Sequence, residues 1–187
     1  MKKSKRIKKS NSWKIKQHRD QFFKKSKTLG YRSRASFKLI ELNKKYKFLK
    51  KNTNLLDLGS CPGGWSQVVS QIIKVGRIMS IDIKNMEPIK NVRFFRGDML
   101  SEETKSVVIK YFKSNLDVIL SDMAADTTGN KALDSIRTNQ LCADVINFSK
   151  ETLKPRGVLV SKIFMGEDFL EVKNLAKSTF NKVNFFK

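Results

Sequence analysis

The sequence lacks the long apolar runs that a membrane protein needs. None of its 187 residues lies in a stretch that approaches the roughly 18 to 20 uncharged apolar residues of a membrane-spanning helix. The opening segment, MKKSKRIKKSNSWK, is basic, but no apolar core follows it to complete a signal peptide. With 40% hydrophobic residues, the chain can bury the core of one globular domain. We therefore expect a cytoplasmic protein with no membrane partner.

Cysteine and histidine are also scarce. The two cysteines are Cys61, in a glycine-rich turn, and Cys142, in a helical pattern, and His18 is the only histidine. Their spacing provides neither a disulfide framework nor a set of metal ligands. We expect a reducing compartment, no metal site and no histidine-based catalysis.

Acidic residues are few, and basic residues are concentrated at one end. The chain has 39 Lys and Arg against 17 Asp and Glu, a net charge of +22, and its first 50 residues hold 19 of the basic and only two of the acidic residues. Trp13, Phe22 and Tyr31 are interleaved with these bases. Basic side chains bind phosphates and aromatic rings stack on nucleobases. The pattern predicts a basic nucleic-acid-binding arm over residues 1–30; a solvated tail or a lipid-binding arm are the alternatives.

The rest of the chain alternates between strand and helix patterns. Strands are predicted at 54–59, 77–83, 92–98, 116–122, 157–166 and 182–186, and helices at 33–49, 65–74, 102–113, 135–153 and 168–180. This alternation predicts one α/β domain over residues 31–187, with a mainly parallel, doubly wound sheet. In such sheets ligands bind beyond the carboxyl ends of the strands.

A glycine-rich turn follows the first predicted strand. LLDLGSCPGGW places Gly59, Gly63 and Gly64 between that strand and a helix. Glycines allow a tight turn and a close approach by a ligand, and the helix N-terminus presents free N–H groups. The spacing differs from G-x-G-x-x-G, which disfavours a nicotinamide or flavin cofactor. The turn therefore predicts a site for another nucleotide-like ligand, or else only joins strand to helix.

Four predicted strands end in aspartates, namely Asp57, Asp82, Asp98 and Asp122. One such residue can accept hydrogen bonds from ribose hydroxyls, or can merely cap a turn or helix. Four together predict a rim of carboxylates, which suits a cationic, adenosine-containing ligand such as S-adenosylmethionine.

A lysine interrupts the apolar segment GVLVSKIFMG. Alternation along a strand places Val158, Val160 and Lys162 on one face. A lysine buried away from any carboxylate tends to lose its proton, whereas Asp122 in a neighbouring strand could hold its amine in place. The alternative is a lysine at a strand end with its amine in water.

Four motifs occur in one order: YRSRASFKL, LDLGSCPGGWSQ, LSDMA and VSKIF. Together they resemble the FtsJ-type 2′-O-ribose RNA methyltransferases, from about Trp13 to the C-terminus, and most closely the bacterial members that methylate a uridine of 23S ribosomal RNA. The resemblance implies a Rossmann-like S-adenosylmethionine-dependent methyltransferase fold and S-adenosylmethionine as the cofactor. It implies catalytic residues at Lys38, Asp122 and Lys162, and cofactor-binding residues at Gly63, Trp65, Asp82, Asp98 and Asp122.

One member of the family's catalytic set does not carry over. In the family a glutamate lies in a last strand, and this chain ends at NKVNFFK before any such segment. Either the sequence is C-terminally truncated or the protein lacks this residue and the closing antiparallel strand. We expect truncation, because a final apolar strand would be an unprotected edge.

The resemblance predicts a methyltransferase that acts on a uridine 2′-hydroxyl of 23S ribosomal RNA, within the large ribosomal subunit and as a monomer. Lys162 would be the general base, Lys38 would orient the hydroxyl, and Asp122 would hold the lysine amine. Arg32 and Arg34 could bind the flanking phosphates. Three alternatives remain: a non-catalytic RNA-binding or ribosome-assembly factor, a tRNA or mRNA-cap 2′-O-methyltransferase with the same chemistry, and a nicotinamide oxidoreductase. A mechanism with Cys61 as nucleophile is a fourth.

Overall fold

Five strands form a single sheet in the structure, a computed structural model that describes residues 21–186. The strands are β1 (Leu55–Leu58), β2 (Ile78–Asp82), β3 (Arg93–Arg96), β4 (Leu116–Ser121) and β5 (Leu153–Ser161). They pair in the order β3-β2-β1-β4-β5, and every pairing is parallel. The strand order reverses between β1 and β4, so the site of ligand binding in such sheets lies beyond the ends of these two strands.

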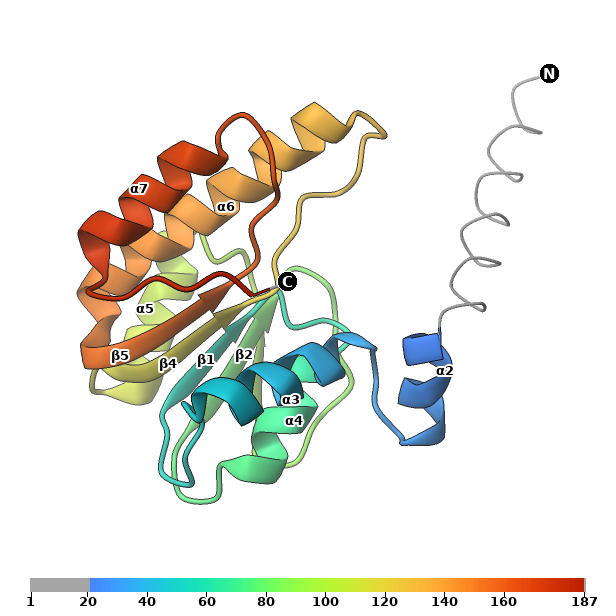
Figure 1. Cartoon of the computed structure of the whole chain (residues 1–187). Helices are drawn as coiled ribbons and strands as arrows, with labels where there is room; N and C mark the ends of the chain where they lie inside the picture. The colour runs from blue at the N-terminus through green and yellow to red at the C-terminus, as the bar shows by residue number, and fades with distance from the viewer. Residues whose placement is uncertain (1–20, 187) are drawn as a thin grey trace.

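Helices cover both faces of the sheet (Figure 1). On one face lie α3 (Ala35–Tyr46) and α4 (Gly64–Ile72), and on the other lie α5 (Glu102–Phe112), α6 (Lys131–Thr152) and α7 (Phe169–Thr179). This confirms the predicted α/β, mainly parallel, doubly wound fold. The central strands β1 and β4 are largely apolar and buried because helices cover both of their faces, whereas β3 at the edge begins and ends with exposed arginines.

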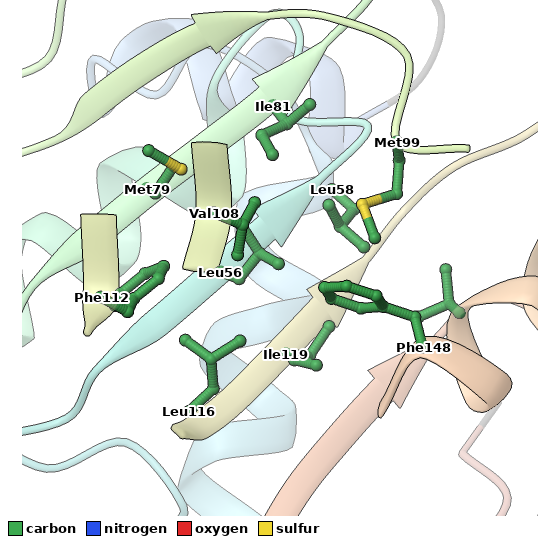
Figure 2. Close-up of a cluster of buried hydrophobic side chains, with 11 residues drawn as sticks. Leu56, Leu58, Met79, Ile81, Met99, Val108, Phe112, Leu116, Ile119 and Phe148 are labelled. Atoms are coloured by element: carbon green, nitrogen blue, oxygen red, sulfur yellow. The ribbon is translucent and has the colours of Figure 1, made fainter. Parts of the chain in front are cut away.

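Side-chain alternation divides the core into two layers. Leu56 and Leu58 of β1 pack with Val108 and Phe112 of α5, as Figure 2 shows. Leu55, which precedes Leu56, points to the other face, where it joins the cluster that contains Trp65 of α4. Asp57 has the same parity as Leu55, so the pleat of β1 buries a carboxyl group beneath the glycine turn.

Local signals in the sequence fix several helix ends. Ser101 accepts a hydrogen bond from the N–H of Thr104 before α5, and Asn130 accepts from two N–H groups at the start of α6. Because Asn130 is the cap, α6 begins at Lys131, earlier than the predicted 135.

Two strand predictions at the C-terminal end are wrong. The fifth strand begins at Leu153 and ends at Ser161, so Lys162 is the first residue after β5 and does not lie within a strand. No strand forms at 182–186 within the described residues. Instead the ring of Phe185 packs against Phe169, with centroids 5.4 Å apart, and the segment takes no part in the sheet.

The predicted basic arm falls mainly on residues 1–20, which lie outside the described residues. Its last part forms α2 (Gln21–Thr28), where Phe22 contacts Phe37 of α3, and Phe37 in turn contacts Tyr31. Over residues 21–186, no helix combines the length and the apolar character that a membrane span needs.

Candidate active site

The turn between β1 and α4 is built on glycines in left-handed conformations. Gly59 has φ 68° and Gly63, which precedes α4, has φ 104°. At Gly59 a side chain would also meet the backbone of Met123, because a Cβ would lie 2.9 Å from Met123 Cα. Only glycine fits here without strain, and the turn lies directly against the residue that follows Asp122.

A cavity of about 300 Å³ opens at this turn. Asp57, Gly59, Trp65 and Asp122 line it from the sheet and α4, and Phe23, Arg32 and Arg34 line it from the segment that carries α2 and enters α3. Of the predicted site residues within the described chain, Trp65 and Asp122 therefore lie in its wall, whereas Gly63 lies just outside it.

Asp57 forms the base of this cavity and is fully buried. Its Oδ2 accepts a 2.5 Å hydrogen bond from the hydroxyl of Ser66, which also lies 2.7 Å from the Ser80 hydroxyl. Its Oδ1 has no hydrogen-bond partner among the described residues. Burial, together with the nearby charges of Asp122 and Asp82, raises the pKa of Asp57 to about 7 despite the bond from Ser66.

These features fit a cationic nucleoside ligand such as S-adenosylmethionine. The cavity offers an unpartnered carboxyl oxygen of Asp57 as an acceptor, the Asp122 carboxylate as a second anionic group, and a glycine backbone that a ligand can approach closely. Unpaired buried acceptors are rare in proteins, so Oδ1 is a ready partner for a ligand donor.

Two further predicted cofactor residues lie at the ends of β2 and β3. The Asp82 carboxylate accepts hydrogen bonds from the N–H groups of Cys61 and Lys84, both 2.8 Å, and so ties the glycine turn to the end of β2. Asp98 is exposed and accepts from the N–H of Leu100. Each carboxylate oxygen has two lone-pair sites, so these bonds leave acceptor capacity on both residues.

Asp122 and Lys162 form an ion pair at the carboxyl edge of the sheet. Lys162 Nζ lies 2.6 Å from Asp122 Oδ1 and donates to the Asp122 carbonyl oxygen at 3.0 Å. The pair follows from the register of β4 and β5, in which Ser121 is paired with Ser161. Asp122 and Lys162 are the residues that follow these two, so they lie side by side. Their side chains are 28% and 32% exposed, which leaves the pair accessible to a ligand.

Lys38 lies apart from this pair. It is exposed on α3, whose N-terminus borders the cavity through Ala35, and it forms no hydrogen bond or ion pair with residues 21–186. The structure thus brings together Asp122 and Lys162 of the predicted catalytic set, and leaves the Lys38 amine in solvent.

Arg32 has a structural role that the sequence did not indicate. Its guanidinium donates to the carbonyl oxygens of Glu87 at 2.6 Å, Pro88 at 2.8 Å and Pro62 at 3.4 Å. It therefore ties the entry to α3, the glycine turn and the loop after β2 into one cavity wall. Its binding of RNA phosphates stays a prediction, because a guanidinium has five N–H donors and these bonds use three.

Cys61 does not have the surroundings of a nucleophile. Burial, and then the charge of Asp82, raise the pKa of its thiol, which disfavours the reactive thiolate. Among the described residues no three His, Cys, Asp or Glu side chains gather as a metal site would require.

Comparison with known proteins gives one consistent result. Residues 31–187 match the model of the FtsJ-like methyltransferases. A ribosomal RNA large subunit methyltransferase E from Pelagibacter ubique is 44% identical over 178 residues, covering 95% of this chain and 88% of the relative. Its namesake from Rickettsia canadensis is 39% identical over 189 residues, covering 98% and 83%.

A solved structure agrees with these sequences. A protein from Plasmodium falciparum, described as a ribosomal RNA methyltransferase, superposes with a TM-score of 0.77 at 33% identity, over 84% of this chain and 91% of that one. The sheet, the glycine turn, the cavity and the three comparisons lead to the same conclusion. The chain belongs to the FtsJ-like methyltransferase family and is an S-adenosylmethionine-dependent methyltransferase.

Proposed function

We propose that this protein methylates a uridine 2′-hydroxyl of the ribosomal RNA of the large subunit, in the cytoplasm and as a monomer. The names of its relatives support the substrate. The observation that carries the proposal is the ion pair between Asp122 and Lys162, which lies beside the cavity at the point where the strand order reverses. In this proposal the Lys162 amine lies between a ligand in the cavity and a substrate above it.

Lys162 is the general base in this proposal. A ribose hydroxyl is a weak nucleophile, so its proton must leave as the new bond to carbon forms. A neutral lysine amine has two N–H groups and one lone pair. In this proposal both N–H groups donate to Asp122, at Oδ1 and at the backbone carbonyl oxygen. The lone pair points away from these two oxygens and accepts the proton of the hydroxyl.

The remaining predicted residues bind and orient. S-adenosylmethionine supplies the methyl group when it is bound. We assign its binding to Gly63, Trp65, Asp82, Asp98 and Asp122, which lie in the cavity wall, in the glycine turn beside it or at the neighbouring strand ends. We assign to Lys38 the orientation of the ribose, because it is exposed on α3 at the side of the cavity from which RNA would approach.

The test of this function is methyl transfer to defined RNAs. Large ribosomal subunits that lack ribose methylation are incubated with the protein and labelled S-adenosylmethionine, beside free 23S ribosomal RNA and tRNA, and the labelled nucleotide is mapped by mass spectrometry. The expected result is one methylated uridine ribose in the subunit. Labelled tRNA would favour the tRNA enzyme, and no transfer to any RNA would favour a non-catalytic RNA-binding factor.

The basic arm is assigned to the RNA backbone. Deletion of residues 1–20 removes nine of the 39 basic residues, so binding to ribosomal RNA should weaken and depend less on salt. The measurement is the slope of the logarithm of the binding constant against the logarithm of the salt concentration. Replacing the two exposed lysines at the end of α5, Lys110 and Lys113, provides the control, since these lie on the opposite face from α3. An equal slope for the deletion and the full chain would contradict the assignment.

A further inference from the structure

The two loops that carry Asp122 and Lys162 are both fastened to α6. In the loop after β4, the N–H of Ala125 donates to the Thr138 hydroxyl at 3.2 Å. Farther along this loop, the Asp134 carboxylate accepts from the N–H and hydroxyl of Thr128, at 2.7 and 2.8 Å. The loop therefore contacts the first turns of α6 at two separate places.

The segment after β5 is held by one side chain, Asn139. This residue is fully buried, and its amide pairs with the backbone of Phe164 in both directions. Its Oδ1 accepts from the Phe164 N–H at 2.8 Å, and its Nδ2 donates to the Phe164 carbonyl oxygen at 3.0 Å and to Asp168 Oδ1 at 3.0 Å. Phe164 is two residues beyond Lys162, so the bonds to Asn139 fix the backbone close to the lysine.

Other contacts of this segment also involve α6. Residues 162–165 have no helix or strand conformation, and the N–H of Lys162 donates to the Ser121 carbonyl oxygen as the last bond of the β4–β5 ladder. Ile163 then packs against a cluster formed by α6 and α7, and Gly166 packs so closely on Ser135 of α6 that a Cβ there would meet the Ser135 hydroxyl. Between the ladder and α7, α6 thus contacts the chain at several successive residues.

We propose that Asn139, assisted by Thr138, is a positioning residue for methyl transfer. These neighbours on α6 hold the two loops at a fixed separation, and so they fix the Lys162 amine against Asp122. The inference rests on the proposed role of Lys162. A buried amide whose donors and acceptor are all satisfied specifies one geometry, whereas an apolar side chain would let the loop shift. A displacement of about 1 Å in a catalytic group can lower the rate about 100-fold.

The test compares substitutions along α6. Asn139→Ala should lower kcat about 10- to 100-fold while the KM for RNA and the Kd for S-adenosylmethionine stay unchanged, because the cavity wall is intact. Thr138→Val should lower kcat less, and Thr138→Ser, which keeps the hydroxyl, should restore it. Gln140→Ala is the matched control, since Gln140 is exposed on the same helix and, among the described residues, its side chain bonds to Asp144 alone. If Asn139→Ala merely lowered the fraction of folded protein, kcat would fall and the apparent Kd for S-adenosylmethionine would rise as well.

Amide hydrogen exchange gives a second measurement that does not depend on activity. Asn139→Ala should speed exchange at the Lys162 and Phe164 N–H groups at least about 10-fold relative to Gln140→Ala, because their loop loses its anchor. If Asn139→Ala does not fold, Asn139→Asp with Asp168→Asn exchanges the donor and acceptor of that pair and serves in its place. Full kcat with unchanged exchange in a folded variant would overturn the positioning role. An inactive wild-type protein whose exchange still responds would contradict the proposed function, and would show that Asn139 anchors the Lys162 loop without serving methyl transfer.

Discussion

Two aspartates at neighbouring strand ends have opposite surroundings. Asp57 in β1 is fully buried, has no ion-pair partner among residues 21–186, and has a pKa raised to about 7 by burial. Asp122, one residue beyond the end of β4, is 28% exposed and pairs with Lys162 at 2.6 Å. The first carboxyl is an uncompensated acceptor under the cavity, and the second is one half of an ion pair at its rim.

The difference shows that residue type and strand position do not settle the role of a strand-end acid. Both residues end apolar strands, and both were predicted as members of one carboxylate rim. Burial decides the state of Asp57, since removing a carboxylate from water without a cation favours its neutral form. The role of Asp122 depends on its ion pair with Lys162 and on its exposure to a ligand. The roles of Asp57 and Asp122 can be distinguished by Asp-to-Asn substitutions, which remove the charge and keep the shape.

The largest expected effect is on activity at Asp122. Asp122→Asn keeps the backbone carbonyl that accepts from Lys162 but removes the charged oxygen, so the amine loses its restraint. We expect kcat to fall about 100-fold or more, in the range that a misplaced general base produces. Asp126→Asn is the control, because its ion pair with Lys84 is exposed. A loss of less than a few-fold for Asp122→Asn would place the chemistry elsewhere.

The next effect is on stability at Asp57 and depends on pH. With a pKa near 3.8 in the unfolded chain and about 7 in the fold, the folded state binds one more proton between these values. Asp57 therefore lowers the free energy of unfolding as pH rises from about 4 to 7, by up to about 4 kcal/mol in total, and adds no further change above pH 7.

Asp57→Asn should remove this decline, and urea unfolding from pH 4 to 8 measures it. Glu103→Gln is the control, because Glu103 is exposed on α5 and should keep the wild-type pH dependence. Parallel curves for Asp57→Asn and the wild type would mean that Asp57 is ionised at neutral pH, and would contradict the raised pKa.

The smallest effect tests the contact between the two regions. Gly59→Ala and Gly129→Ala both force a side chain into a left-handed conformation, but only at Gly59 does the new Cβ meet backbone, that of Met123. Gly59→Ala should therefore destabilise the fold about 1 to 3 kcal/mol more than Gly129→Ala. It should also weaken S-adenosylmethionine binding, measured by calorimetry. Equal losses in both variants would show that the glycine turn and the loop after β4 move independently.

Much of the fold follows from local patterns in the sequence. Strand and helix alternation, the glycines of LLDLGSCPGGW and the caps at Ser101 and Asn130 each act within a few residues, so they can be read from short windows. The failed strand at 182–186 shows the limit of this reasoning. Its apolar pattern fits a strand, but a strand also needs a neighbouring strand with which to pair, and Phe185 packs against α7 instead.

The site was predictable only where strand register supplies the geometry. Asp122 and Lys162 meet because β4 and β5 are adjacent and parallel, which the alternation implies. The hydrogen bonds of Arg32 and Asn139 could not be predicted, because Arg32 donates to carbonyls 30 to 56 residues away and Asn139 bonds to Phe164 across 25 residues. Such contacts depend on how the helices dock, and nothing in the residue type separates Arg32 from Arg34.

The central claim is that Lys162 takes the proton of the ribose hydroxyl. It is tested by single-turnover methyl transfer to unmethylated large subunits by Lys162→Ala, together with the Kd for S-adenosylmethionine by calorimetry. We predict a rate lowered about 100- to 10,000-fold, the contribution of general base catalysis, at an unchanged Kd. A rate within a few-fold of the wild type would contradict the assignment, and a weakened Kd with a normal rate at saturation would make Lys162 a binding residue.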